Sequence, residues 1–352
     1  MKETEKYIDL LVQILAIPSL SRREETRADF LESWLRQEGF TMKRLKNNLI
    51  VTGGNDPAEA TILLNSHLDT VSPGEGWDSD PFLPVKEEDK IIGLGSNDAG
   101  ASVVSMIAAY RGLIEQALAD SVVLVISAEE EISGKNGLSS VIRKLPGLKF
   151  AIVGEPTGMQ PAIAERGLMV VDATASGISG HAARNEGENA IYKALVDIDK
   201  IRKIEFTDHS AWLKDPSMNI TMIKAGRDHN VVPSKCHFVI DVRSNDRYPN
   251  ERLLELLGAR CNSELIARSM RLKSSFLSEN HPVCKLLNDM KLSPFGSPTL
   301  SDMALLEIPA VKIGPGNSSR SHTANEYIHI SELEQAIEIY GNLLEKIVKT
   351  EL

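Results

Sequence analysis

The chain has 352 residues, of which 42% are hydrophobic, and this length favours two domains over one. A net charge of −10 and an isoelectric point of about 5.4 argue against nucleic acid or an anionic membrane surface as the main partner. Cys236, Cys261 and Cys284 are widely spaced, so we expect free thiols in a reducing compartment. No apolar run reaches the length of a signal-peptide core or a membrane span, which predicts a cytoplasmic protein.

The chain opens with helical patterns and a first strand. Apolar residues at helical spacing predict helices over residues 4–16 and 23–37, which Pro18 and Gly39 end. A strand is predicted over residues 48–52. Helices that alternate with short strands are typical of an α/β fold.

The next apolar run, residues 62–64, predicts a buried strand of a parallel sheet, and His67 and Asp69 follow it. In open α/β sheets, ligands bind beyond the carboxyl ends of the strands. An imidazole there, with a carboxylate two residues later, suits a metal ligand and the group that orients it. Taken alone, the pair fits an ordinary turn equally well.

Residues 71–90 contain three prolines and predict a loop. The segment 99–109 is rich in Ala, Gly and Ser and predicts a helix that packs close to the sheet. Asp98 directly precedes this helix, where it is either an N-cap or a ligand.

Two further strands end in carboxylates. The strand predicted at 122–126 leads to the run 129–131, Glu-Glu-Glu, and the strand predicted at 151–153 leads to Glu155. Three adjacent carboxylates repel one another, so a buried run is tolerable only if cations compensate it. The alternative is a solvated acidic loop.

The middle of the chain has a different pattern, with a predicted β-α-β-β-α-β order. The expected strands are 169–175, 219–223, 236–243 and 264–272, and the expected helices are 189–200 and 251–260. This order is the split βαβ arrangement of a ferredoxin-like α+β domain. We therefore predict a mostly parallel-sheet domain formed by residues 1–164 and 274–352, which an α+β domain at 165–273 interrupts.

Five separated positions point to one edge of the predicted sheet: His67, Asp98, the run 129–131, Glu155 and His322, which follows a predicted strand at 310–313. Imidazole nitrogens and carboxylate oxygens are donors for zinc, cobalt or manganese. The acidic residues exceed what one divalent cation needs, so we expect two cations that share a bridging carboxylate. Such a pair polarises a carbonyl and activates a water, while a further carboxylate acts as general base.

Seven motifs spread over nearly the whole chain have a familiar form: Ser66-His-Leu-Asp69, Gly95-Ser-Asn-Asp98, Glu129-Glu-Glu131, Gly154-Glu-Pro156, Ser179-Gly-His181, Asn230-Val-Val-Pro233 and His322-Thr-Ala-Asn-Glu326. With these motifs the sequence resembles the metallo-aminoacylase/carboxypeptidase family, peptidase family M20. That family includes acetylornithine deacetylase, succinyl-diaminopimelate desuccinylase and glutamate carboxypeptidase.

The resemblance implies a site for two divalent cations. The expected metal is zinc or cobalt, and manganese is an alternative. It implies that His67 and Glu155 bind one cation. Glu131 and His322 would bind the other, and Asp98 would bridge the two.

The resemblance also implies how protons move. Asp69 would hold the imidazole of His67. Glu130 would be the general base, which takes a proton from the attacking water and passes it to the leaving amine. A shift of one residue within the run 129–131 would instead make Glu129 the base and Glu130 the ligand.

In the family, the inserted domain is a lid that also forms the dimer. The resemblance implies that His181 stabilises the tetrahedral intermediate, often from the partner subunit. Arg166, Asn230 and Arg243 fall where relatives contact the acyl group or the carboxylate of the substrate. The alternatives are a structural histidine in a glycine-rich turn and a surface ion pair of Arg243.

The sequence departs from the family pattern at two places. The family continues its bridging aspartate as Asp-x-Lys-Gly, whereas this chain has Asp98-Ala-Gly-Ala101 without the lysine. The desuccinylase branch has an arginine two residues after the aspartate of a Thr-Ser-Asp motif, and here Ala304 stands at that place after Asp302. The second departure lowers the fit to a diaminopimelate substrate.

The resemblance therefore implies a cytoplasmic, homodimeric metallohydrolase that cleaves the amide of an N-acyl amino acid. The expected substrate is N-acetylornithine, or N-acetylcitrulline or N-succinylornithine, in arginine biosynthesis. The alternatives within this chemistry are a succinyl-diaminopimelate desuccinylase and a di- or aminopeptidase. From a different class, a catalytically inactive binding subunit is disfavoured because every predicted ligand and Glu130 are retained.

Overall fold

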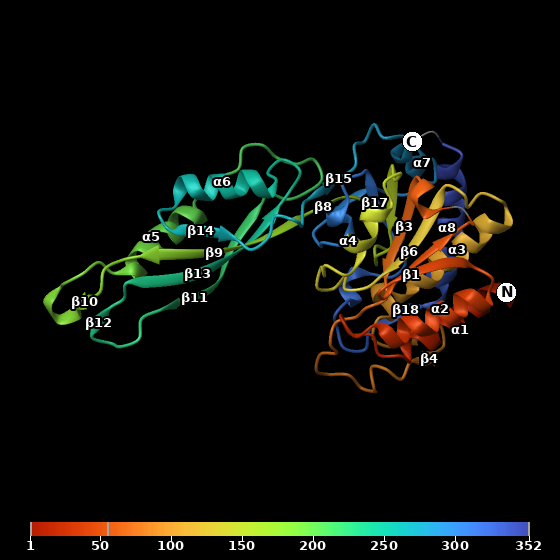
Figure 1. Cartoon of the computed structure of the whole chain (residues 1–352), viewed down its shortest axis with the longest axis horizontal. Helices are drawn as coiled ribbons and strands as arrows, with labels where there is room; N and C mark the ends of the chain where they lie inside the picture. Colours follow the sequence, from red (N-terminus) through yellow and green to blue (C-terminus); the bar gives the residue numbers. More distant parts are fainter. Residues whose placement is uncertain (1, 55, 351–352) are drawn as a thin grey trace. The chain divides into compact units, whose positions relative to one another are not determined.

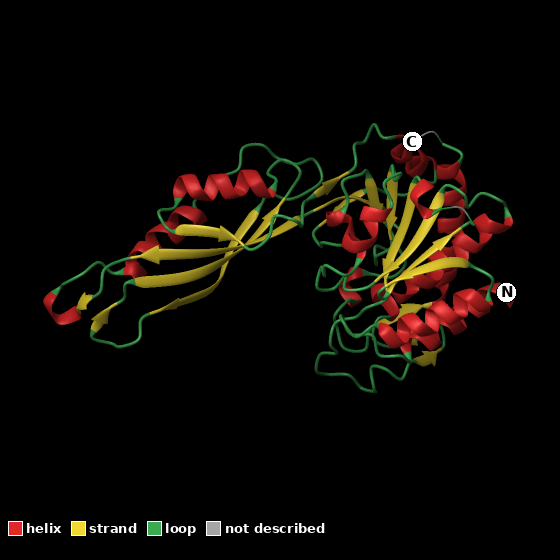
Figure 2. Cartoon of the chain, in the orientation of Figure 1, coloured by secondary structure: helices red, strands yellow, loops and turns green. Residues whose placement is uncertain are grey.

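The computed structural model describes residues 2–54 and 56–350, which form two compact units (Figures 1 and 2). The first unit comprises Met1–Ile163, Leu277–Phe295 and Ser301–Leu352, and the second comprises Ala164–Phe276 and Gly296–Leu300. Among the described residues, none of the helices combines the length and apolar character that a membrane crossing requires. All three cysteines are free, as expected.

The first unit contains a mixed sheet whose central strands are parallel (Figure 2). In spatial order these strands are β6 (Val122–Ser127), β3 (Ile62–His67), β7 (Phe150–Val153) and β17 (Ala310–Lys312). All their residues are buried, which explains the apolar runs with which these strands begin, such as Ile62–Leu64 in β3. The parallel strands place their carboxyl ends at one edge of the sheet, as predicted.

Antiparallel strands extend the sheet on both sides. Beyond β6 lie β2 (Asn48–Thr52) and β1 (Thr41–Leu45), and β8 (Ala162–Glu165) pairs with β17. The short strands β15 (Ser275–Phe276) and β16 (Phe295–Ser297) pair with β8. The predicted loop 71–90 is partly wrong, because β4 (Val85–Glu87) and β5 (Lys90–Ile92) form a hairpin there, which β18 (Tyr327–His329) joins.

Helices cover both faces of the sheet. The α-helices of this unit are α1 (Lys2–Leu15), α2 (Glu25–Gln37), α3 (Ala101–Glu115), α4 (Leu138–Val141), α7 (Pro282–Asp289) and α8 (Ile330–Val348). Helix α4 packs on the face that carries Leu63 and Val123, and α3 lies against β3 and β6. The small residues of α3 allow this close packing, and most of the helix is buried.

Single helical turns complete the unit's connections. They are η1 (Pro57–Glu59), the π-helical turn η2 (Ser96–Gly100), η3 (Ile142–Lys144), η5 (Asp302–Leu305) and η6 (Ser318–Arg320). Turn η2 directly precedes α3 and contains Asp98, so this aspartate lies before the helix as predicted. It is not the N-cap, which is Gly100.

The second unit has the predicted ferredoxin-like order. Its elements are β9 (Gly167–Ser176), α5 (Ala190–Arg202), β11 (Ser217–Ala225), β13 (Lys235–Ser244), α6 (Asn250–Arg260) and β14 (Glu264–Ala267). The strands pair antiparallel in the order β11-β13-β9-β14, so the split βαβ prediction is confirmed. Strand β14 is shorter than predicted and ends at Ala267.

A two-stranded arm extends this unit. Strands β10 (Gly180–His181) and β12 (Val231–Val232) pair antiparallel, and the turn η4 (Ala182–Arg184) follows β10. The arm lies beyond the end of β9 that is marked by Ser176 (Figure 1). Its side chains are mostly exposed, in contrast to the core that α5 and α6 form on one face of the four-stranded sheet.

Candidate metal centre

Side chains from five separate segments of the first unit meet at the carboxyl edge of the parallel strands. They are His67 at the end of β3, Asp98 in η2, Glu130 and Glu131 after β6, Glu155 after β7, and His322 between η6 and β18. All six positions were predicted from the sequence, and this edge brings them together.

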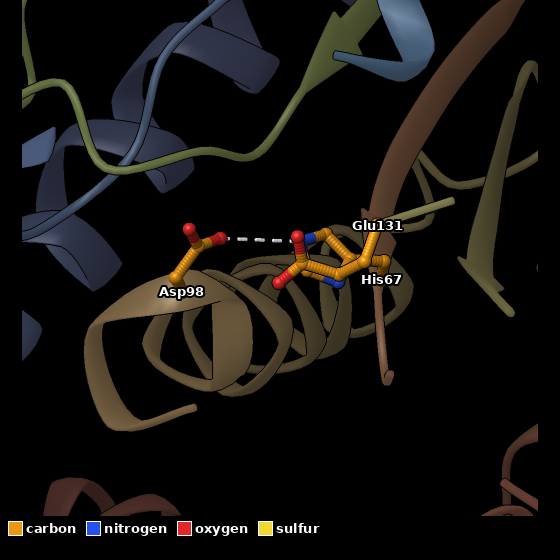
Figure 3. Close-up of side chains that lie close together, drawn as sticks. All are labelled: His67, Asp98 and Glu131. Carbon is orange, nitrogen blue, oxygen red and sulfur yellow. Dashed lines mark hydrogen bonds and ion pairs between the residues drawn. The ribbon is translucent and has the colours of Figure 1, made fainter. Parts of the chain in front are cut away.

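The imidazole of His67 is buried in the middle of this group. Its Nε2 atom is 3.2 Å from Oδ1 of Asp98, 3.6 Å from Oε1 of Glu155 and 3.9 Å from Oε2 of Glu130. Figure 3 shows the interaction between His67 and Asp98, with Glu131 beside the imidazole. One nitrogen therefore faces several carboxylates, as a metal ligand would.

His322 approaches the same aspartate from the other side. Its Nε2 atom lies 2.9 Å from Oε2 of Glu131 and 3.6 Å from Oδ2 of Asp98. Asp98 thus directs one carboxylate oxygen to each histidine, which is the arrangement of a bridging carboxylate. The side chain of His322 is 52% exposed and that of Glu131 is 7% exposed, so solvent reaches the site on the side of His322.

The donor set fits divalent cations. Two groups, His67 with Asp98 and Glu131, and His67 with Glu130 and Glu155, have ligand atoms that all lie within 4.8 Å of one another. One imidazole with carboxylates is a ligand set that zinc, cobalt and manganese accept. The residues present are therefore suited to hold metal ions.

The three glutamates of the run 129–131 have different surroundings. The carboxylate of Glu129 accepts hydrogen bonds from the side chain and the backbone N–H of Asn136, at 2.8 and 3.2 Å. It belongs to neither donor group, whereas Glu130 and Glu131 each belong to one.

Asp69 lies beside the imidazole of His67, where the sequence analysis expected it, and it also contacts a neighbouring loop. The nearest acceptor for Nδ1 of His67 is the backbone carbonyl of Asp69 at 3.0 Å, while the carboxylate is 3.6 Å away. That carboxylate accepts the backbone N–H groups of Glu130 and Glu131, at 3.0 and 3.2 Å, and the hydroxyl of Ser21 at 2.7 Å. Asp69 therefore positions the loop that carries the two glutamates.

Glu326 holds the turn that carries Asp98. Its buried carboxylate accepts the backbone N–H groups of Gly95, Asn97 and Asp98, at 3.0, 2.8 and 2.9 Å. The side chain of Asn97 in turn bonds both backbone groups of Asn317, at 2.9 and 3.1 Å. Our sequence analysis gave Glu326 no role, although it closes the motif that begins with His322.

Arg27 is a buried cation that the sequence analysis also missed. Its guanidinium donates to the carbonyl of Ile17 through two nitrogens, at 2.9 and 2.7 Å, and to the carbonyl of Leu68 at 2.9 Å. The spacing of the sequence could have indicated this burial. Arg27 precedes Leu31 and Leu35 at intervals of four residues, so the three residues share one buried face of the helix.

Crowded negative charge shifts the protonation of this region. Burial, followed by the carboxylate of Glu155, raises the pKa of Glu130 well above its usual range. The hydrogen bond to Glu131 raises the pKa of His322 to about 9, and burial raises the pKa of Glu326 to about 7. Bound cations would offset this excess of carboxylates.

The predicted substrate residues of the second unit form two separate pairs. Arg166 donates to the carbonyls of Asp215 at 2.7 Å and Arg243 at 3.4 Å, and Arg243 forms an ion pair with Asp241 at 2.8 Å. This ion pair is the alternative role that we considered for Arg243.

The other pair, His181 and Asn230, belongs to the two-stranded arm, where the N–H of Ala182 donates to the carbonyl of Asn230 at 3.0 Å. Arg166 precedes β9 and the arm follows it. Because β9 rises about 3.3 Å per residue over its length, the two pairs are about 30 Å apart.

The convergence of imidazoles and carboxylates at a parallel-sheet edge is typical of a metal-dependent enzyme. Residues 63–346 match the model of peptidase family M20/M25/M40, and the chain belongs to this family.

Three curated relatives cover almost the whole chain. An acetylornithine deacetylase of Proteus mirabilis is 27% identical over 98% of this chain and 97% of its own. A succinyl-diaminopimelate desuccinylase of Acidiphilium cryptum is 24% identical over 97% of this chain and 98% of its own. A LysW-lysine/LysW-ornithine hydrolase of Saccharolobus solfataricus is 29% identical over 97% of this chain and 96% of its own. The family and these relatives identify the chain as an amidohydrolase, which confirms the predicted enzyme class.

Solved structures share the fold. Aminopeptidase PepT of Bacillus cereus superimposes with a TM-score of 0.78 at 22% identity, over 99% of both chains. A dinuclear metal-binding peptidase of the M20 family from Bacillus subtilis gives 0.72 at 17% identity, also over 99% of both. The predicted fold class is therefore confirmed.

Proposed function

We propose that this amidohydrolase uses two divalent cations to remove the acyl group of an N-acyl amino acid. The proposed substrate is N-acetylornithine, or N-acetylcitrulline or N-succinylornithine, in arginine biosynthesis in the cytoplasm. The observation that carries the two-metal proposal is Asp98, which turns one oxygen to His67 and the other to His322. The similarity to an acetylornithine deacetylase supports the substrate class.

Each predicted ligand has a place in this proposal. His67 and Glu155, which lie 3.6 Å apart, would hold one cation, Glu131 and His322, 2.9 Å apart, would hold the other, and Asp98 would be shared between them. Zinc or cobalt is the expected metal, and manganese is the alternative. When bound, the cations supply Lewis-acid polarisation of the scissile carbonyl and activation of the attacking water.

Glu130 is the proposed general base. Its carboxylate lies 3.9 Å from Nε2 of His67, at the edge of the donor cluster, and this partition of ligands leaves it free to move a proton. It takes a proton from the attacking water and delivers it to the nitrogen of the leaving amine. Asp69 keeps the Glu130 carboxylate in place through the backbone N–H at 3.0 Å.

We further propose that the chain forms a homodimer through its second unit. The edge strand β11 exposes Met222 and Ile223, and the adjacent helix α5 exposes Tyr192, Leu195 and Val196. An apolar edge strand beside an apolar helix face invites pairing with a second copy. A two-fold axis at β11 would bury the same patch on both copies.

The reaction is tested by amine release from the metal-loaded protein. The substrates are N-acetylornithine, N-acetylcitrulline, N-succinylornithine, N-succinyl-diaminopimelate and several dipeptides. We expect turnover of an acyl-ornithine or acyl-citrulline that a chelator abolishes and that zinc or cobalt restores. Turnover of dipeptides alone, or of the diaminopimelate substrate alone, would contradict the proposed substrate.

The role of Glu130 is tested by Glu130→Gln, with Glu129→Gln as the matched control. We expect Glu130→Gln to bind two metals per chain and to lose hydrolysis by at least about a hundredfold, as is usual for a general base. Glu129→Gln should keep most of the activity, because Asn136 and not the reacting atoms contacts that carboxylate. The reverse result would place the base one residue earlier.

A further inference from the structure

A hollow of about 430 Å³ opens on the first unit beside Glu131. Three segments line it. The connection after α1 contributes Leu20 and Arg23, the one after β3 contributes Val71, and the one after β6 contributes Glu131 and Ile132. The volume is in the range of small-molecule sites. Glu131 contributes both to this wall and to the candidate metal centre, so the hollow adjoins the centre.

Arg23 is the one cation among the residues that line the hollow. Its side chain is exposed and makes no hydrogen bond or ion pair with any residue in 2–54 or 56–350. The nearby acidic residues are engaged elsewhere, since Glu131 pairs with His322 and Asp69 binds backbone N–H groups. The guanidinium therefore keeps all its donors for a ligand.

The rest of the wall is mixed: Leu20, Val71 and Ile132 are aliphatic, and Ser21, Thr70 and Ser72 carry hydroxyl groups. Ile132 is 45% exposed, and Leu20 and Val71 are half-buried beside the same hollow. A ligand that fits this surface carries a carboxylate for Arg23, because a guanidinium binds a carboxylate through two parallel hydrogen bonds, and the remainder of the ligand contacts both aliphatic and hydroxyl side chains.

We propose that this hollow, the Arg23 hollow, is a subsite that binds a carboxylate of the substrate while its amide lies at the metal centre. The inference rests on the proposed deacylase function and assigns the recognition of one carboxylate of its substrate to Arg23. The carboxylate has two possible sources, the far end of a dicarboxylic acyl group such as succinyl, and the α-carboxylate of the amino acid. Without a cation, the surrounding carboxylates would repel either one.

The subsite is tested with Arg23→Gln and with Arg22→Gln as the control. Arg22 is the neighbouring exposed arginine and does not line the hollow. Two matched substrate pairs separate the two sources: N-succinylornithine against N-succinamoylornithine, and N-acetylornithine against its α-carboxamide. In each pair a neutral amide replaces one carboxylate with little change of shape.

We expect Arg23→Gln to lower the preference for the charged member of one pair, measured as a ratio of kcat/KM, by about tenfold, the usual size for a lost charged hydrogen bond. The affected pair identifies which carboxylate the hollow binds. Arg22→Gln should keep both preferences. Unchanged preferences in Arg23→Gln would overturn the inference, and so would an equal loss in both variants.

A binding measurement keeps this test separate from the proposed reaction. Calorimetric titration of the metal-loaded protein with succinate and with succinamate needs no turnover. We expect Arg23→Gln to weaken succinate binding by about tenfold relative to succinamate, and Arg22→Gln to leave it unchanged. If no acyl amino acid is hydrolysed but this difference is present, the reaction assignment fails and the anion subsite stands. If Arg23→Gln binds succinate as tightly as the unmodified protein does while the substrates are hydrolysed, the proposed carboxylate subsite is wrong.

Discussion

Arg27 brings a permanent positive charge to the back of the candidate metal centre. The charges of Asp69 and Glu326 favour its protonated form, although burial lowers its pKa to about 10. The family pattern has a lysine where this chain has Gly100, and a Cβ atom at Gly100 would meet the carbonyl oxygen of Gly95 at 2.5 Å. Arg27 of α2 thus supplies a buried positive charge near Asp69 and Glu326 in a chain that has no lysine at the start of α3.

Replacing Arg27 with methionine should therefore destabilise the first unit. The carbonyls of Ile17 and Leu68 would lose their donors, and two buried carboxylates would lose their cation. Breaking a buried charged network of this kind costs about 3 kcal/mol. Urea unfolding of the chelated protein measures the effect, and Arg36→Met, an exposed position on the same helix, should change stability by less than about 0.5 kcal/mol.

Metal affinity separates a positioning role of Arg27 from a merely structural one. Arg27→Lys keeps the charge but cannot reproduce the fork of three hydrogen bonds. If Arg27 positions His67 and Asp69, Arg27→Met should weaken zinc binding by about tenfold, and Arg27→Lys should recover part of that loss. Equal zinc affinity in all three proteins would contradict the positioning role.

At the scale of elements, the site depends on turns that follow rigid strands. His67 ends a strand that is buried along its whole length, so its position is well determined. Asp98 lies in a turn, and the carboxylate of Glu326 fixes that turn through three backbone N–H groups. Asn97 and Asn317 then tie the turn to the segment before His322.

Glu326→Gln should loosen this turn with almost no change in volume. A carboxamide has one oxygen, and its NH₂ group would face at least one of the N–H donors that Glu326 now binds. The unsatisfied donor costs about 1–3 kcal/mol. We expect weaker metal binding by about tenfold in calorimetry, whereas Glu334→Gln, on the exposed face of α8, should match the unmodified protein. Unchanged affinity in Glu326→Gln would show that the turn is held by other contacts.

The elements that the sequence predicted well are those whose environment is simple. Strands β3 and β6 are buried on both faces, and each begins with a continuous apolar run, Ile62–Leu64 and Val122–Ile126. Strand β1 was missed because it is an edge strand with charged residues at Lys43 and Arg44 and only one buried side chain. The hairpin of β4 and β5 was missed because each strand has only three residues.

For the site, the residue types and strand ends were predictable, but the roles of supporting residues were not. The sequence places Asp69 two residues after His67, which suggests that it orients the imidazole. In the structure its carboxylate lies 3.6 Å from Nδ1 of His67, and it also accepts the backbone N–H groups of Glu130 and Glu131, which the sequence did not indicate. Contacts such as these, and that of Glu326 with Asp98, arise only from the tertiary arrangement of the loops.

At the scale of the molecule, metal binding should stabilise the two units unequally. The candidate ligands are spread from His67 to His322 but all belong to the first unit. A cation at a hundred times its dissociation constant stabilises the folded state by about 2.7 kcal/mol. Chelation should therefore speed hydrogen exchange in β3 and β6 and leave β9 and β13 unchanged, and zinc should reverse the effect. An equal change of exchange rate in all four strands would contradict the prediction that metal binding stabilises the first unit more than the second.

The second unit presents its predicted substrate residues at two ends of one sheet, about 30 Å apart by the rise of β9. A small N-acyl amino acid cannot contact both ends of a single copy. If His181 of one copy serves the centre of its partner, His181→Ala and Glu130→Ala are each inactive, yet mixed dimers contain one intact site. Random exchange of subunits at equal amounts should restore about a quarter of the full activity.

Disrupting the proposed interface provides the control for this complementation. Met222 and Ile223 are 66% and 55% exposed on the edge strand β11, so Met222→Asp with Ile223→Asp should fold and yet prevent the pairing of two copies. Sedimentation should then give a monomer, and mixtures that carry these changes should recover no activity. Recovery by the monomers, or no recovery by mixed dimers that sedimentation confirms, would mean that His181 does not act across the interface.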